Sequence, residues 1–129
     1  MSYRVTVTAR FEAAHNLIDY AGGPEPLHGH SYRVEAVLEA NRLQQYDLAV
    51  DFVPAKKALG AIAKELDYTY INEHPAFAGR NTSAENLARF FAERLETSGA
   101  LGWARVVEVV VWEGPENRAT YRADPQSPG

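Results

Sequence analysis

Two long alternating segments, residues 3–15 and 28–40, constrain the fold of this chain more than any other feature. In the first segment the odd-numbered positions are mostly apolar, and in the second the even-numbered positions form the apolar set. A period of two is typical of β-strands that are buried on one face. The segment between them contains Gly22, Gly23 and Pro24, which indicate a loop. We therefore expect two neighbouring strands that share one buried face.

Two segments with helical spacing come next in the chain. Asp51 is a plausible N-cap of a first helix, because Pro54 suits the first turn. Thr82 lies three residues before Glu85, a spacing that fits a capping box at the start of a second helix. The apolar stripes expected on the two helices are Ala55, Leu59, Ile62 and Leu66, and Ala84, Leu87, Phe91 and Leu95.

Strand patterns return at residues 104–114 and 118–124, joined by a turn that contains Gly114, Pro115 and Asn117. The order ββααββ predicts an α+β fold, an antiparallel sheet with two helices on one face. A chain of 129 residues, 46% of them hydrophobic, is long enough for one domain with a core and too short for two. We place this domain at residues 1–123 and expect 124–129 to be a flexible tail.

The composition excludes several classes of function. A net charge of −4 and the lack of any Lys/Arg cluster argue against a nucleic-acid or membrane partner. The alternating N-terminus does not resemble a secretion signal, and no apolar run could span a membrane, so a cytoplasmic location is expected. The chain has no cysteine, which excludes disulfides, thiolate metal sites and a cysteine nucleophile.

Three histidines extend the apolar faces of the two expected strands. His28 and His30 lie two positions apart and therefore project to the same side, and His15 lies on the inward face of the neighbouring strand. Three neutral imidazoles are a sufficient ligand set for a tetrahedral zinc ion with one open position, which is the arrangement of a catalytic site. The alternative is three histidines at the surface or the edge of the core that bind no metal.

Two carboxylates are candidates for roles beside such a metal. Glu25 precedes His28 by three residues in the Gly/Pro loop, where it could act as a general base or lie in solvent. Glu113 ends a strand on the face of Val107, Val109 and Val111. It could accept two parallel hydrogen bonds from the amidine-like edge of a pterin, or it could leave the sheet into solvent.

Several ordered motifs along nearly the whole chain resemble those of the 6-pyruvoyltetrahydropterin synthase and 6-carboxytetrahydropterin synthase family. The motifs are FEAAH at 11–15, LHGHSY at 27–32, VDF at 50–52, LDYTYIN at 66–72, NTSAENLA at 81–88 and VVVWEG at 109–114. The resemblance implies the tunnelling fold, assembled as a hexamer of two stacked trimers whose sheets close into barrels, with active sites at subunit interfaces. Closure would also satisfy the edges of a short antiparallel sheet.

The resemblance also implies roles for individual residues. It implies zinc on His15, His28 and His30, a pterin anchored by Glu113, and help in pterin binding from Thr82 and Ser83 at the start of the second helix. Two positions differ from the usual pattern. Pro24 stands where family members that act on dihydroneopterin triphosphate carry a catalytic cysteine, and Tyr68 stands where they carry the histidine of a proton relay, so that Asp67 alone is retained of that relay.

A variant branch of the family has the sequence ExxHGH, which matches Glu25 to His30. Similarity to this branch implies cleavage of the side chain of 7,8-dihydroneopterin triphosphate, or of a related reduced pterin, to 6-hydroxymethyl-7,8-dihydropterin. In this interpretation Glu25 is the base, and Asp67 and Tyr68 support it. A tyrosine is a poor proton shuttle at neutral pH, because its unperturbed pKa is about 10.

Two alternatives remain open. One is a diverged pterin-binding homologue that has lost the synthase reaction and acts on another pterin-like ligand. The other is a 6-carboxytetrahydropterin synthase of the deazapurine (queuosine) pathway, which the missing thiol disfavours. No Lys/Arg cluster predicts a triphosphate site, although Arg10 or Arg80 could contribute to one within an assembly. His74, in NEHPAF, is expected to be an exposed loop residue.

Overall fold

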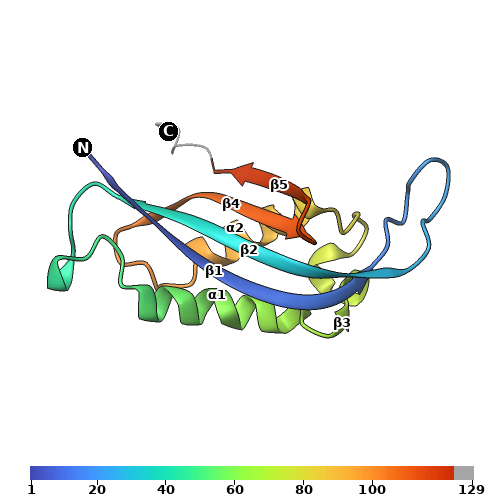
Figure 1. Cartoon of the computed structure of the whole chain (residues 1–129), viewed down its shortest axis with the longest axis horizontal. Coiled ribbons are helices and arrows are strands. Elements are labelled where there is room, and N and C mark those ends of the chain that lie inside the picture. The colour runs from blue at the N-terminus through green and yellow to red at the C-terminus, as the bar shows by residue number, and fades with distance from the viewer. Residues whose placement is uncertain (124–129) are drawn as a thin grey trace.

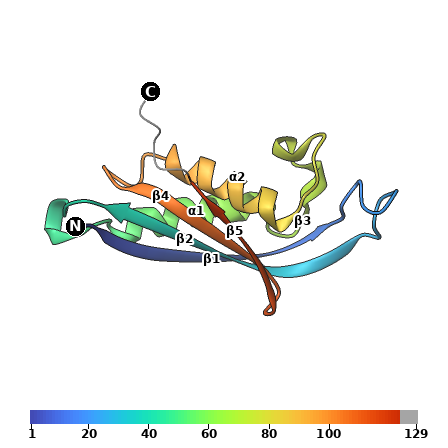
Figure 2. The ribbon, with the colours of Figure 1, turned by 90° about the horizontal axis from the view of Figure 1, so that it is seen from above.

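The computed structural model describes residues 1–123 and contains one five-stranded sheet with two helices on one of its faces (Figures 1 and 2). The strand order is β3-β1-β2-β4-β5. The strands are β1 (Tyr3–His15), β2 (His28–Ala40), β3 (Thr69–Tyr70), β4 (Arg105–Glu113) and β5 (Asn117–Arg122). The predicted α+β fold is therefore confirmed, whereas barrel closure by oligomerisation stays a prediction. The tail predicted at 124–129 lies outside the described residues.

The two alternating segments form the strands that the period of two predicts. β1 and β2 pair antiparallel along their whole length, from Tyr3 opposite Ala40 to His15 opposite His28. The two-residue strand β3 is the one element of the sheet that the sequence patterns did not predict. It runs parallel to β1 and pairs only with Ala13 and Ala14, and a strand of two residues is too short to show a period.

The helices are α1 (Phe52–Leu66) and α2 (Ala84–Glu96), and three short 3₁₀ turns lie between strands and helices: η1 (Gln45–Asp47), η2 (Ile71–Glu73) and η3 (Pro75–Phe77). Asp51 caps α1 as predicted, because its side chain accepts a hydrogen bond of 3.0 Å from the backbone N–H of Val53. The predicted cap of α2 is wrong by one residue. Ser83 is the N-cap and accepts from Asn86 N–H, while the side chain of Thr82 is turned into the protein.

The cap assignment makes a testable prediction. Replacing Ser83 by alanine removes the acceptor of the Asn86 N–H and should lower the free energy of unfolding by about 1 kcal/mol. The measurement is the denaturant midpoint of the variant against the unchanged chain. Ser2→Ala is the control, because Ser2 is exposed and lies before β1. An equal midpoint for Ser83→Ala and the unchanged chain would contradict the assignment.

The core lies between the sheet and the two helices. Phe11 of β1 stacks on Tyr32 of β2 with ring centroids 4.7 Å apart, and Phe91 of α2 packs against Phe11 at 5.7 Å. All three rings are buried, and stacked and tilted aromatic contacts add to the stabilisation that burial itself provides. The ends of β1 and β2 that carry the histidines therefore adjoin a closely packed part of the core.

A bulge changes which residues of β4 face the core. The register shifts between Val37 and Leu38, so that Leu38 lies opposite Val106 and Val37 lies opposite Glu108. Val106 therefore packs with Val109 and Val111 in the core cluster between the sheet and the helices. The prediction that Val107 shares the face of Val109 and Val111 was wrong. Glu113 continues the face of Val109 and Val111, as predicted, because the bulge lies before them.

In the described residues, neither helix has the length and apolar character required to cross a membrane.

Candidate metal centre

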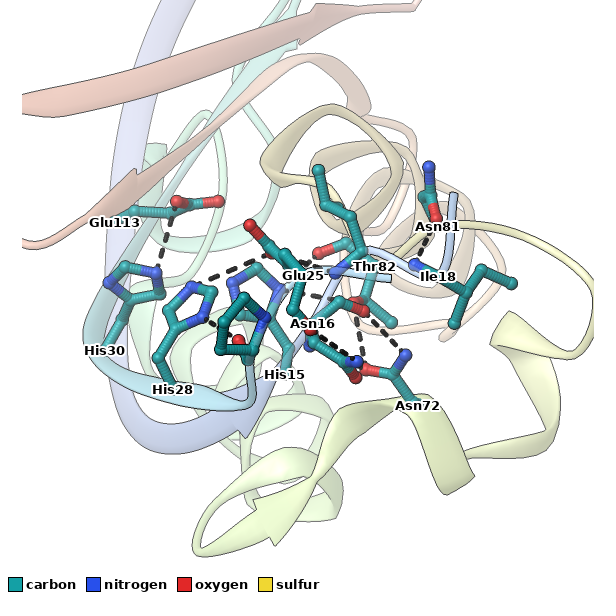
Figure 3. Close-up of polar contacts among 12 residues, drawn as sticks. His15, Asn16, Ile18, Glu25, His28, His30, Asn72, Asn81, Thr82 and Glu113 are labelled. Carbon is teal, nitrogen blue, oxygen red and sulfur yellow. Dashed lines mark hydrogen bonds and ion pairs between the residues drawn. The ribbon is translucent and has the colours of Figure 1, made fainter. Parts of the chain in front are cut away.

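The ends of β1 and β2 bring three imidazoles to one point. His15 lies directly opposite His28 in the register, and His30 lies opposite Ala13 on the same face. One nitrogen from each ring lies within 4.8 Å of the others, and Figure 3 shows the three side chains side by side. The sequence prediction that these histidines converge is confirmed by this geometry.

Backbone carbonyls orient two of the three rings. The Nδ1–H of His15 donates to the carbonyl oxygen of Thr82 at 2.7 Å, and that of His28 donates to the carbonyl oxygen of Pro26 at 2.9 Å. A carbonyl only accepts hydrogen bonds, so in both rings Nδ1 carries the proton and Nε2 has a free lone pair. This is the arrangement that outer partners impose on metal-ligating histidines.

The free nitrogens fit a metal ion. Among residues 1–123, Nε2 of His15 and Nε2 of His30 are buried and find no hydrogen-bond partner. Buried polar atoms without a partner are rare in native proteins unless an ion or a water satisfies them. Three imidazole nitrogens are a ligand set suited to Zn²⁺ with one open position.

The electrostatics favour the neutral, metal-binding form of the third ring. Burial lowers the pKa of His30, and the nearby rings of His15 and His28 lower it further, against the opposing effect of Glu113 and Glu25. A metal competes with protons for an imidazole, so a lowered pKa keeps the ligand available at neutral pH.

Glu25 lies beside this cluster, as the loop position suggested. Its Oε1 is 3.9 Å from Nε2 of His28 and accepts a hydrogen bond of 2.8 Å from the backbone N–H of Leu17. The side chain is 21% exposed, so the carboxylate is partly covered but open to a ligand. In Figure 3 it extends toward the same space as the imidazoles. A carboxylate held next to a metal site can take a proton from a metal-bound hydroxyl group.

Glu113 lies beside another histidine of the cluster, at the end of β4. Its Oε2 is 3.4 Å from Nε2 of His30 (Figure 3). In the sheet, Glu113 lies opposite Tyr32. Burial, with Glu113 and Glu25 nearby, raises the pKa of the Tyr32 phenol well above its ordinary value, so this tyrosine stays neutral and is no candidate base. Two carboxylates thus lie next to the histidines.

Asp67 and Tyr68 take a different position. The Oδ1 of Asp67 accepts from the backbone N–H of Glu12 at 2.8 Å, and the N–H of Tyr68 donates to the Glu12 carbonyl at 2.5 Å. The Tyr68 side chain is 84% exposed. Within residues 1–123 of a single protomer, no hydrogen bond or ion pair joins either side chain to the histidines. Tyr68 and His30 nevertheless line one hollow together. A role for Asp67 and Tyr68 in this site stays a prediction.

The start of α2 holds the His15 side chain. Thr82 is fully buried, and both its carbonyl and its hydroxyl oxygen face Nδ1 of His15, at 2.7 and 3.2 Å. Ser83 is engaged in capping the helix through its hydroxyl group. Contact of Thr82 and Ser83 with a pterin stays a prediction.

Two asparagines near the site were missed by the sequence patterns. Asn16 follows the ligand His15, and Asn72 lies in η2, and together they form a hydrogen-bond network that includes Thr82 (Figure 3). Asn72 lies within LDYTYIN, but a side-chain contact between residues 56 positions apart leaves no periodic signal. The position of Asn16 directly after a ligand was the one available signal.

The remaining candidates lie away from the cluster. Arg10 is an even-numbered residue of β1 and, together with Arg33 and Trp112, lines a hollow on the sheet face that the helices leave uncovered. Arg80 is exposed after η3. His74 lies in a loop as expected, but its side chain is only 20% exposed, because it bonds Glu65 at 3.0 Å and packs against Phe77 and Phe90.

Known proteins resemble this chain along most of its length. A 6-carboxy-5,6,7,8-tetrahydropterin synthase of Aquifex aeolicus is 29% identical over 162 aligned residues, which cover 96% of this chain and 100% of the relative. A dihydroneopterin monophosphate aldolase of Pyrococcus furiosus is 31% identical over 116 residues, which cover 90% of this chain and 94% of the relative.

Solved structures and a family model agree with these relatives. The 6-pyruvoyl tetrahydropterin synthase of Caenorhabditis elegans matches with a TM-score of 0.78 at 19% identity over 96% of this chain and 97% of that one. The Plasmodium vivax 6-pyruvoyltetrahydropterin synthase matches with a TM-score of 0.75 at 20% identity over 97% and 99%. These matches show the tunnelling fold. The model of 6-pyruvoyl tetrahydropterin synthase matches residues 4–124, and the chain therefore belongs to the 6-pyruvoyl tetrahydropterin synthase family.

Proposed function

We propose that this chain is a zinc-dependent pterin aldolase, a lyase that cleaves the side chain of a 7,8-dihydroneopterin compound to give 6-hydroxymethyl-7,8-dihydropterin. The observation that carries the proposal is the position of Glu25, 3.9 Å from His28 and beside a three-histidine cluster, in a chain that has no cysteine. The aldolase from Pyrococcus furiosus supports the reaction class, because it shares 31% identity over 90% of this chain.

Each residue has a separate role in the proposed reaction. His15, His28 and His30 would hold the zinc ion, which supplies Lewis acidity toward the side-chain oxygens of the substrate. The Glu25 carboxylate accepts the proton of the 2′-hydroxyl group. The C1′–C2′ bond then breaks, C2′ leaves as an aldehyde, and the electron pair passes to the C6–N5 imine of the pterin ring. A proton returned to C1′ completes the hydroxymethyl group.

Glu113 would bind the pterin ring of the substrate, at the end away from the side chain that is cleaved. Its carboxylate can accept two parallel hydrogen bonds from the 2-amino and N3 groups of the pterin. Glu113 and Glu25 lie beside different histidines, His30 and His28, so a pterin held by Glu113 would have its side chain close to Glu25. Ser83 belongs to the same proposal as a further pterin contact, and Thr82, which is fully buried, would help by holding His15.

The charge around the site supports a proposal for the phosphorylation state of the substrate. Arg10 lies on the other face of the sheet, and the charged groups nearest the histidines are the carboxylates Glu25 and Glu113. This protomer therefore offers little positive charge for a triphosphate, and a monophosphate, as in the name of the relative from Pyrococcus furiosus, is the better candidate. The triphosphate remains a substrate to test.

Assembly is part of the same proposal. In the described residues β1 pairs with β3 only at Ala13 and Ala14, so the rest of that edge and the outer edge of β5 are open to strands of other subunits. A cytoplasmic homohexamer of two trimers would close these edges. It could also bring Asp67 and Tyr68 of one subunit to the histidines of another, in support of Glu25.

Two observations favour alternative functions. The Aquifex aeolicus relative covers this chain almost completely and is a 6-carboxy-5,6,7,8-tetrahydropterin synthase, which favours that activity, although Pro24 stands at the thiol position. The replacement of the relay histidine by Tyr68 favours a diverged pterin-binding protein.

The deciding experiment supplies the zinc-loaded protein with 7,8-dihydroneopterin, its monophosphate and its triphosphate in parallel. The products are oxidised and identified by chromatography with fluorescence detection. We expect 6-hydroxymethylpterin, most rapidly from the monophosphate. A 6-carboxy product would support the synthase instead. Tight pterin binding without any product would support the diverged binding protein.

A further inference from the structure

The side-chain amide of Asn72 pairs with both backbone groups of Asn16, the residue after the ligand His15. Nδ2 of Asn72 donates to the Asn16 carbonyl at 2.8 Å, and its Oδ1 accepts from the Asn16 N–H at 3.2 Å. β1 ends at His15, so this side chain replaces the strand partner that the next residue would otherwise lack. Asn72 follows Ile71 in η2. Ile71 is fully buried, so the core fixes the position of Asn72.

Asn16 and Leu17 in turn hold Glu25 through three hydrogen bonds. Nδ2 of Asn16 donates to the Glu25 carbonyl at 3.1 Å, and the Glu25 N–H donates to the Leu17 carbonyl at 3.0 Å. The Leu17 N–H donates to the Glu25 carboxylate at 2.8 Å and so fixes its direction. Any shift of residues 16 and 17 must therefore move the Glu25 carboxylate.

Asn72 also contacts the metal side of the site. The hydroxyl group of Thr82 donates to Oδ1 of Asn72 at 3.1 Å, and the carbonyl of Thr82 accepts from Nδ1 of His15. The Asn72 amide thus contacts both Thr82, which orients His15, and Asn16, which helps to hold Glu25 (Figure 3). The amide is neutral, so what it contributes is geometry rather than charge.

We infer that Asn72 is a positioning residue that fixes the Glu25 carboxylate relative to the three histidines. The inference rests on the proposed role of Glu25 as the base. Its physical reason is that a base displaced by about 1 Å from a reactive geometry can cost about 10²-fold in rate.

The test is Asn72→Asp, which keeps the size of the side chain. The change retains an acceptor for the Asn16 N–H but places a carboxylate oxygen against the Asn16 carbonyl in place of a donor. We expect kcat of the zinc-loaded protein to fall by about 10- to 100-fold with a much smaller change in KM. We also expect faster hydrogen exchange at the Leu17 amide, because its acceptor moves.

Gln44→Glu is the matched control. Nε2 of Gln44 donates to the carbonyls of Ala49 and Leu101, and its Oε1 accepts from Trp103 N–H, so it also joins segments through one amide. It lies beside η1, at the end of the sheet away from the β1–β2 connection (Figure 1). The control should leave kcat and exchange at Leu17 unchanged.

The outcomes separate this inference from the proposed function. Unchanged exchange at Leu17 in Asn72→Asp overturns the inference, whatever happens to turnover. Full additivity of Asn72→Asp and Glu25→Gln in kcat also overturns it, since a residue that acts through Glu25 loses its effect when that carboxylate is gone. Faster exchange at Leu17 in a protein whose unchanged form cleaves no pterin supports the positioning and defeats the aldolase. If Asn72→Asp does not fold, the uncharged Asn72→Ala gives the same two readouts.

Discussion

Replacing Glu25 by glutamine is expected to lower the turnover of a dihydroneopterin substrate by about 10²- to 10⁴-fold, the range typical of a general base. The amide oxygen of glutamine can still accept from the Leu17 N–H, so the loop should keep its conformation. His28 should keep its orientation as well, because its Nδ1–H donates to the Pro26 carbonyl rather than to Glu25. Zinc content and pterin affinity should therefore stay close to those of the unchanged protein.

The control for this prediction is Asp19→Asn, which removes one negative charge from the same β1–β2 connection. Asp19 contacts Asn81 through its backbone and not through its carboxylate. Turnover is measured with zinc saturating and with the metal content of each variant determined separately. Normal turnover in Glu25→Gln would exclude Glu25 as the base, and an equal loss in Asp19→Asn would indicate an effect of overall charge.

The convergence of the three histidines was predictable because two simple periodicities determine it. His28 and His30 are two positions apart in a strand, and His15 lies on the apolar face of the adjacent strand, so only the register between the strands had to be found. Burial of the apolar faces sets that register, because a slip by one residue would expose every apolar side chain. Glu113 was placed on the correct face for the same reason, even though the bulge in β4 made the prediction for Val107 wrong.

Other parts of the site depend on contacts that no local pattern encodes. Thr82 and Ser83 are adjacent in sequence, and either residue type can cap a helix. The Thr82 side chain contacts the buried His15, 67 residues away, and Ser83 caps α2 instead. The pairing of Asn72 with Asn16 has the same character. Asp67 and Tyr68 were assigned from family resemblance, which describes a site between subunits, and their role stays a prediction. In a single protomer both residues hydrogen-bond the backbone of Glu12.

Replacing Glu113 by alanine should weaken pterin binding by about 2 to 5 kcal/mol, the usual cost of removing one partner of a buried, charged hydrogen-bond pair. This corresponds to a dissociation constant raised about 30- to 5,000-fold. The physical reason is that the 2-amino and N3 groups of the bound pterin would lose both acceptors in a site where water replaces them poorly. The measurement is calorimetric titration of an unreactive pterin into the zinc-loaded protein.

Glu113 also lies 3.4 Å from Nε2 of His30, so a loss of pterin affinity could in principle arise through the metal. The titration is therefore repeated at several zinc concentrations above saturation, where an indirect effect through metal loss disappears and a lost pterin contact does not. Glu108→Ala is the matched control, because Glu108 lies in the same strand opposite Val37 and Arg122, away from the histidines. Pterin affinity that is equal in Glu113→Ala and Glu108→Ala would show that the pterin binds elsewhere, and the position of Glu113 would then be explained by its contact with His30 alone.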